Sequence, residues 1–137
     1  MKSDGRQDLR KRTKEFALRI IKLFAALPTT PEAQVLGRQL LKSGTSVGAH
    51  YREACRAKSN ADFISKIEGG LQELDETLYW LELLGEAEIV APVRLEPLER
   101  ETNELIAIFV SMAKGVKQKK AGNRGGIVIP HPSALIP

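Results

Sequence analysis

The chain has 137 residues, 42% hydrophobic and 28% charged, with a net charge of +4, which is typical of one globular domain. A single cysteine, Cys55, excludes a disulfide framework and a cysteine-based metal cluster, so we expect a cytoplasmic protein. The charged N-terminus lacks the pattern of a signal peptide, and the longest apolar run, Leu105–Val110, is too short to span a bilayer. We therefore expect no membrane partner.

The first two helices are marked by apolar spacing and by their boundary residues. Across Gln7–Leu27, apolar residues recur every three or four positions, and Pro28 ends the pattern. Thr30 is the expected N-cap of the second helix, because Pro31 follows it at the first helical position. This helix is predicted to continue to about Lys58.

The third and fourth helices carry apolar residues at heptad spacing. Ser59 with Asp62 forms a capping-box pattern that predicts the third helix start, and Gly85 marks its end. The fourth helix is predicted to begin near Pro97. The positions expected to face the core are Ile64, Ile67, Leu71, Leu74, Leu78 and Leu81 in the third helix, and Leu98, Thr102, Leu105, Phe109, Met112 and Val116 in the fourth.

These patterns predict an all-α fold, an antiparallel up-and-down four-helix bundle. We expect residues 1–120 to form the bundle and the Gly- and Pro-containing residues 121–137 to form a disordered or extended tail. Poor helix formers occupy Gly44–Gly48, yet the heptad spacing continues through them. Tertiary packing can offset this weak propensity, since small residues let another helix approach; we expect Gly69 and Gly70 to receive the small-residue stripe of Gly37, Gly44, Gly48 and Cys55.

Charge is segregated on the second and third helices. A basic line on the second helix consists of Arg38, Lys42, Arg52 and Arg56, and an acidic line on the third consists of Glu68, Asp75, Glu82 and Glu86. Such segregation is typical either of an electrostatically specified interface or of a basic surface for a polyanion.

The candidate nucleic-acid-binding residues are basic side chains outside the apolar faces: Arg12, Arg19, Lys22, Arg38, Lys42, Arg52 and Arg56. Aromatic residues suited to stacking are missing among them, which argues against base-specific recognition of single strands. Tyr79 and Trp80 lie off the apolar face of the third helix, so they are candidates for an oligomer interface.

The polar residues Gln39, Ser43, Ser46, His50 and Glu53 follow one edge of the apolar face of the second helix, and Ser46, His50 and Glu53 are the candidate site residues among them. We interpret them as a buried polar network that fixes helix register; a proton-linked switch or ligand contact at His50 is the alternative. The order His50-x-x-Glu53 is the reverse of the di-iron bundle motif, and no phosphate-loop pattern surrounds the glycines. We therefore expect no catalytic residue, metal or cofactor, and predict that the protein is not an enzyme.

The run Gln39–Ala54 resembles the signature of the bacterial four helix bundle protein family, which includes proteins encoded in intervening sequences of large-subunit ribosomal RNA. The match continues through Asp62–Ile64 to Glu76–Leu84. The resemblance implies a homopentameric ring and a distant likeness to the accessory variability determinant of diversity-generating retroelements, a basic barrel that works with a reverse transcriptase and nucleic acid. His50 stands where the family pattern usually has Asn.

Two functions remain open from the sequence. The first is a non-enzymatic oligomeric bundle whose basic surface binds RNA or DNA. The second is a protein-interaction scaffold whose basic and acidic helix faces pair between subunits, without nucleic-acid binding.

Overall fold

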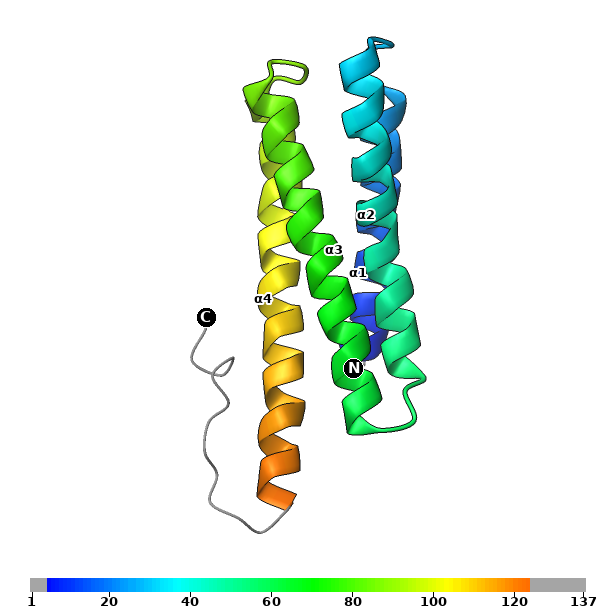
Figure 1. Cartoon of the computed structure of the whole chain (residues 1–137), viewed down its shortest axis with the longest axis vertical. Coiled ribbons are helices and arrows are strands. Elements are labelled where there is room, and N and C mark those ends of the chain that lie inside the picture. The colour runs from blue at the N-terminus through cyan, green and yellow to red at the C-terminus, as the bar shows by residue number, and fades with distance from the viewer. Residues whose placement is uncertain (1–4, 124–137) are drawn as a thin grey trace.

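The computed structural model describes residues 5–123, and the side chains of residues 8–119. In that range the chain forms four long helices in an up-and-down order (Figure 1). They are α1 (Gly5–Ala25), α2 (Pro31–Cys55), α3 (Asn60–Glu86) and α4 (Pro92–Asn123). Together they hold well over two-thirds of the chain, which confirms the all-α bundle. The predicted tail lies outside the described residues, apart from the last turn of α4.

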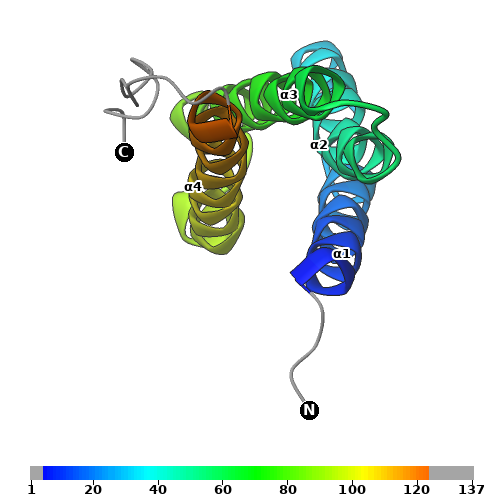
Figure 2. The same ribbon diagram turned by 90° about the horizontal axis from the view of Figure 1, so that it is seen from below.

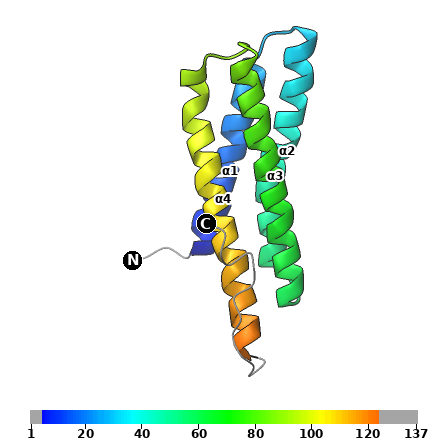
Figure 3. The same cartoon turned by 60° about the vertical axis from the view of Figure 1, so that its left-hand side comes forward.

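Each helix packs mainly against its neighbour in sequence, whereas α1 and α4 approach each other at few places. Viewed along the helices, the four elements follow an arch from α1 through α2 and α3 to α4, with α1 and α4 as its two ends (Figure 2). Figure 3 shows the antiparallel course of the helices from a further side. The interior is closed by large buried side chains from all four helices, among them Phe16, Leu40, Leu74 and Phe109.

The predicted caps of α2 and α3 are confirmed. The Thr30 side chain accepts a hydrogen bond from the Ala33 amide at 3.4 Å, and the Ser59 side chain accepts one from the Asp62 amide at 3.0 Å. Both cap residues have extended backbones. Because Ser59 must be extended to cap α3, α2 ends earlier than predicted, at Cys55.

The predicted start of α4 near Pro97 is wrong, because α4 begins at Pro92 and Pro97 lies inside it. Proline lacks the amide that would bond to the carbonyl four residues earlier, and this usually limits a helix. Here the turn before Pro97 carries Leu95, and the turn after it begins with Leu98, both of which are buried in the core. Burial of these two side chains offsets the lost hydrogen bond.

The buried face of α3 is rotated from the predicted one. Ile67, Leu74 and Leu81 are buried as predicted, whereas Ile64, Leu71 and Leu78 are only half-buried. The buried face also includes two small residues and one further leucine: Gly70, Thr77 and Leu84. Small side chains at these positions let the neighbouring helices approach closely, and hydrophobicity alone does not indicate them.

The partner of the small-residue stripe on α2 is α1, not α3. A Cβ at Gly44 would lie 2.8 Å from Cγ1 of Ile20, and one at Gly48 would lie 3.1 Å from Oγ1 of Thr13. Gly69 and Gly70 instead accommodate His50 of α2 and Phe109 of α4. The expected pairing of the glycines on α2 and α3 is therefore wrong, although close approach does explain both sets.

Candidate nucleic-acid interface

The basic line of α2 lies on the surface of the bundle. Arg38, Lys42 and Arg56 are exposed and Arg52 is half-buried. Within residues 8–119, none of these four cations forms a salt bridge with a carboxylate. Their positive charge is therefore available to an external anion.

A shallow groove continues this basic surface from α2 onto α1. Its volume is about 340 Å³, and Lys14 of α1 and Arg52 of α2 both line it. Small side chains, including Ala17, Thr45 and Ala49, form the rest of its lining. Cations from two helices thus share one surface, as is needed for several contacts to a phosphate backbone.

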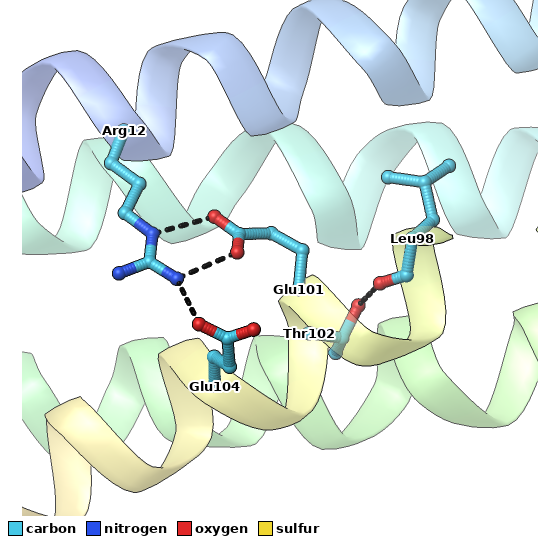
Figure 4. A network of polar contacts seen from close by, with 5 residues as sticks. All are labelled: Arg12, Leu98, Glu101, Thr102 and Glu104. Atoms are coloured by element: carbon cyan, nitrogen blue, oxygen red, sulfur yellow. Dashed lines mark hydrogen bonds and ion pairs between the residues drawn. The ribbon is translucent and has the colours of Figure 1, made fainter. Parts of the chain in front are cut away.

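Arg12 is a correction to the predicted set of binding residues. Its Nε donates to Glu101 Oε2 and its Nη2 to Glu101 Oε1, both at 2.7 Å, and Nη2 also donates to Glu104 at 2.8 Å (Figure 4). These bonds, led by the one to Glu101, raise the pKa of Arg12 above its usual range despite its partial burial. Arg12 therefore joins α1 to α4 and is not free for a phosphate.

Replacing Arg12 with Met is expected to lower the free energy of unfolding by about 1–2 kcal/mol, because Glu101 would lose its charged hydrogen bonds. The partial exposure of Arg12 reduces this effect. Urea denaturation at fixed protein concentration measures it. Lys11→Met, at an exposed neighbouring position, is the control and should change stability little. Equal stability of the two variants would contradict a role for Arg12 in holding α1 to α4.

The remaining basic candidates of α1 point to different places. Arg19 is exposed and lines a groove between α1 and α4 that Glu15 and Glu101 also line. Lys22 is exposed within the last turn of α1. The structure thus brings Arg52 of α2 and Lys14 of α1 to one groove, but it does not bring Arg12 or Arg19 there.

The predicted buried network of Ser46, His50 and Glu53 is wrong. Ser46 donates to the Lys42 carbonyl of its own helix at 2.6 Å, and Glu53 is exposed, 3.3 Å from Lys66. His50 is half-buried with Nε2 3.7 Å from Glu73, and its Nδ1 is buried without a hydrogen-bond partner in the described part of the chain. The three residues therefore act separately.

A buried polar contact between α2 and α3 does exist at Ser43, which lies on the predicted polar edge of α2. Thr77 Oγ1 donates to Ser43 Oγ at 2.9 Å, and both side chains are buried. The Ser43 hydroxyl also lies 3.3 Å from the Leu40 carbonyl. Two hydroxyls can satisfy each other in a core, which is the role predicted for the polar edge of α2. Of that edge, Ser43 is the residue that makes the buried contact with α3.

The two aromatic candidates differ in exposure. Tyr79 is 53% exposed, with its ring 5.0 Å from that of Trp80. Trp80 is half-buried against the core, and its Nε1 is buried without a hydrogen-bond partner in the described residues. Tyr79 thus presents free aromatic surface, whereas Trp80 contributes mainly to its own chain.

Negative charge gathers on α3 and the facing part of α4. All four residues of the acidic line are exposed. Burial, and then repulsion from Glu82, Glu96 and Glu86, raises the pKa of Glu99 above its usual value. In the acidic line, Glu68 is paired with Lys117 at 2.8 Å, while the other members form no salt bridge within residues 8–119.

No group of three or more His, Cys, Asp or Glu side chains in the described range could hold a metal ion. None of the four helices, as far as the structure describes them, has a segment long and apolar enough to cross a membrane. A groove of about 470 Å³ at the α2–α3 turn is lined by apolar residues, including Tyr51, Phe63 and Met112, and by the polar turn residues Lys58, Ser59 and Asn60.

The fold and its surface define an up-and-down helical bundle with separate basic and acidic faces. Residues 6–111 match the family model of the 23S rRNA-intervening sequence protein, and the chain belongs to this family. A crystal structure at 1.70 Å resolution, of a protein with unknown function from the S23 ribosomal protein family of Bacteroides thetaiotaomicron VPI-5482, is 39% identical. The match has a TM-score of 0.73 and covers 77% of this chain and 98% of that one. A search of curated proteins finds no match.

Proposed function

We propose that the protein is a non-enzymatic, oligomeric helical bundle of the cytoplasm that binds the phosphate backbone of RNA or DNA. The observation that carries the proposal is the basic line of α2: its four cations have no salt bridge with a carboxylate in the described residues, and one of them, Arg52, shares a shallow groove with Lys14 of α1. An assembly of five subunits is favoured, because the run Gln39–Ala54 resembles the signature of the bacterial four helix bundle protein family. The net charge of the chain, +4, also favours binding to a polyanion.

The chemistry of this surface suits a phosphate backbone better than base edges. Arginine guanidinium groups bind phosphate oxygens in a bidentate way, and Arg38, Arg52 and Arg56 supply three of them. No aromatic side chain lines the groove between α1 and α2, so a stacked base has no platform there. We therefore expect binding that depends weakly on sequence and strongly on salt.

Replacing Arg38, Arg52 and Arg56 together with Ala should weaken binding to mixed-sequence RNA or DNA. Each phosphate contact releases condensed counterions when it forms. Losing up to about three contacts should therefore reduce the steepness of log affinity against log salt concentration in proportion. Fluorescence anisotropy over a salt series measures the slope. The control variant removes three cations from α4 by changing Arg94, Arg100 and Lys119 to Ala, and should leave the slope unchanged.

Two results would contradict the proposal. One is that the assembled wild-type protein binds neither nucleic acid at low salt. The other is that the α4 control flattens the salt slope as much as the α2 variant does. The second result would mean that binding depends on the net charge of the protein and not on a particular surface of α2.

A second function is favoured by the exposed acidic line. Three of its carboxylates, Asp75, Glu82 and Glu86, have no salt bridge in residues 8–119. In a protein-interaction scaffold, the basic line of one subunit would pair with these carboxylates of another. The triple α2 variant would then lose oligomerisation, as seen by light scattering, and the wild-type protein would have no nucleic-acid binding to lose.

A further inference from the structure

The outer surface of α1 has an apolar centre that the described part of the chain leaves uncovered. Leu18 is 55% exposed and Ile21 is 44% exposed. Lys14 and Lys22, four residues before and after Leu18, lie on the same helix face and are exposed. We call these four residues the Leu18 surface. An exposed apolar centre with a charged rim is typical of a protein interface.

The outer surface of α3 has the complementary arrangement. Tyr79 is the exposed apolar side chain, and it has Asp75 four residues before it and Glu82 three residues after it. All three residues are exposed on one helix face. We call them the Tyr79 surface. The charges of both surfaces lie about 4.5–6 Å along the helix from the apolar centre, given a rise of about 1.5 Å per residue.

These two surfaces cannot cover each other within one chain. In the arch of helices, α2 stands between α1 and α3 (Figure 2). Leu18, Ile21 and Tyr79 also remain exposed to solvent in the presence of all the other described residues. Contact between the two surfaces therefore requires a second copy of the chain.

We propose that the Tyr79 surface of one copy docks on the Leu18 surface of another, with Asp75 and Glu82 paired to Lys14 and Lys22. The proposal rests on the self-association included in the proposed function and names the faces that carry it. Tyr79 supplies a large, rigid contact area, and Leu18 and Ile21 supply the apolar surface that it covers. The flanking charges fix the register of the two helices.

The basic line of α2 is a weaker partner for the Tyr79 surface. Between its cations lie Thr45 and Ala49, which offer little apolar area to an aromatic ring. Assigning the Tyr79 surface to α1 also leaves the α2 cations uncovered for a polyanion. Lys14 is then used by the contact between copies, whereas Arg38, Lys42, Arg52 and Arg56 of α2 stay open to nucleic acid, so self-association through paired helix faces does not exclude nucleic-acid binding.

The proposed contact is heterologous, because each copy uses one surface of each kind. Repeated contacts of this type generate a closed ring or an open chain, depending on the rotation between copies. This property gives the proposal a test that simple loss of assembly would not provide. Two variants with opposite charge reversals should each fail to assemble alone, and a mixture of the two should assemble.

The first variant carries Lys14→Glu and Lys22→Glu, so both of its surfaces are acidic. The second carries Asp75→Lys and Glu82→Lys, so both are basic. Each alone should sediment and scatter light as a monomer under conditions in which the wild-type protein is an oligomer, because like charges would face each other. Circular dichroism should report an unchanged helix content, since all four positions are exposed.

A 1:1 mixture of the two variants should assemble again, because every junction then pairs an acidic surface with a basic one. The two variants must alternate around a ring, so only rings with an even number of subunits avoid a repulsive junction. A single chain with all four substitutions should return to the wild-type mass, since its charges are exchanged between the faces. Arg38→Glu with Arg56→Glu is the control for charge reversal on α2 and should leave the mass unchanged.

The possible failures are distinguishable. A wild-type monomer at high micromolar concentration would overturn both the self-association in the proposed function and this interface. A wild-type oligomer whose mass survives both charge-reversed variants would overturn the interface alone. Failure of the mixture and of the four-substitution chain to assemble, with helix content intact, would also overturn it. Nucleic-acid binding is measured separately on the α2 variants.

Discussion

Replacing Leu74 with Ala is expected to lower the free energy of unfolding by about 2–5 kcal/mol, from lost transfer energy and the cavity left behind. Leu74 is 0% exposed in the middle of α3 and belongs to the core that all four helices share. Chemical denaturation followed by circular dichroism measures the change. Protein concentration must be held fixed, because dissociation of an oligomer contributes to apparent stability.

Leu78→Ala is the matched control, because it makes the same chemical change one turn along the same helix. Leu78 is only half-buried, so less apolar area returns to water and a smaller loss is expected. The comparison tests the rotation of the buried face of α3. Equal losses at the two positions would restore the heptad face predicted from the sequence and would contradict the observed one.

Helix boundaries were predictable wherever a local side chain sets them. Thr30 and Ser59 cap their helices through hydrogen bonds to residues three positions on, and both positions were correct. The start of α4 depends instead on distant packing, since Leu95 and Leu98 are buried on both sides of Pro97. Local propensity cannot include the free energy of that burial, so the prediction placed the helix start too late.

The buried face of α3 shows a second limit of sequence patterns. A leucine or isoleucine is buried only if a neighbouring helix packs on its side of α3. Gly70 and Thr77 carry little or no apolar area, yet they are the places where Phe109 and Ser43 come closest to α3. Close approach at small residues sets the rotation of the helix. The heptad pattern was therefore right in spacing and wrong in phase.

The candidate surface was predictable in charge but not in pairing. Spacing correctly placed Arg38, Lys42 and Arg56 on one exposed face, because helix periodicity alone determines this. It gave no warning that Arg12 would be held by Glu101 of α4, 89 residues away in sequence. Such pairs depend on how two helices meet across the bundle. The same limit applies to His50, whose partner Glu73 belongs to a neighbouring helix.

The close contact between α1 and α2 can be tested at Gly44. A Cβ there would lie 2.8 Å from Cγ1 and 2.9 Å from Cγ2 of Ile20, atoms held near the backbone of α1 that cannot swing away easily. Gly44→Ala should therefore lower the free energy of unfolding by about 1–3 kcal/mol through overpacking. This loss should appear even though alanine in a helix is otherwise favoured over glycine by about 0.5–1 kcal/mol.

Gly115→Ala separates these two effects, because a Cβ at Gly115 of α4 would meet no atom within 4 Å. Only the helix-propensity gain applies there, so stability should rise by up to about 1 kcal/mol. The opposite signs of the two Gly→Ala changes, measured by the same denaturation experiment, would show that packing against Ile20 decides the residue at position 44. A stabilising Gly44→Ala would mean that α1 does not pack on α2 there, and the poor helix formers at Gly44–Gly48 would need another cause.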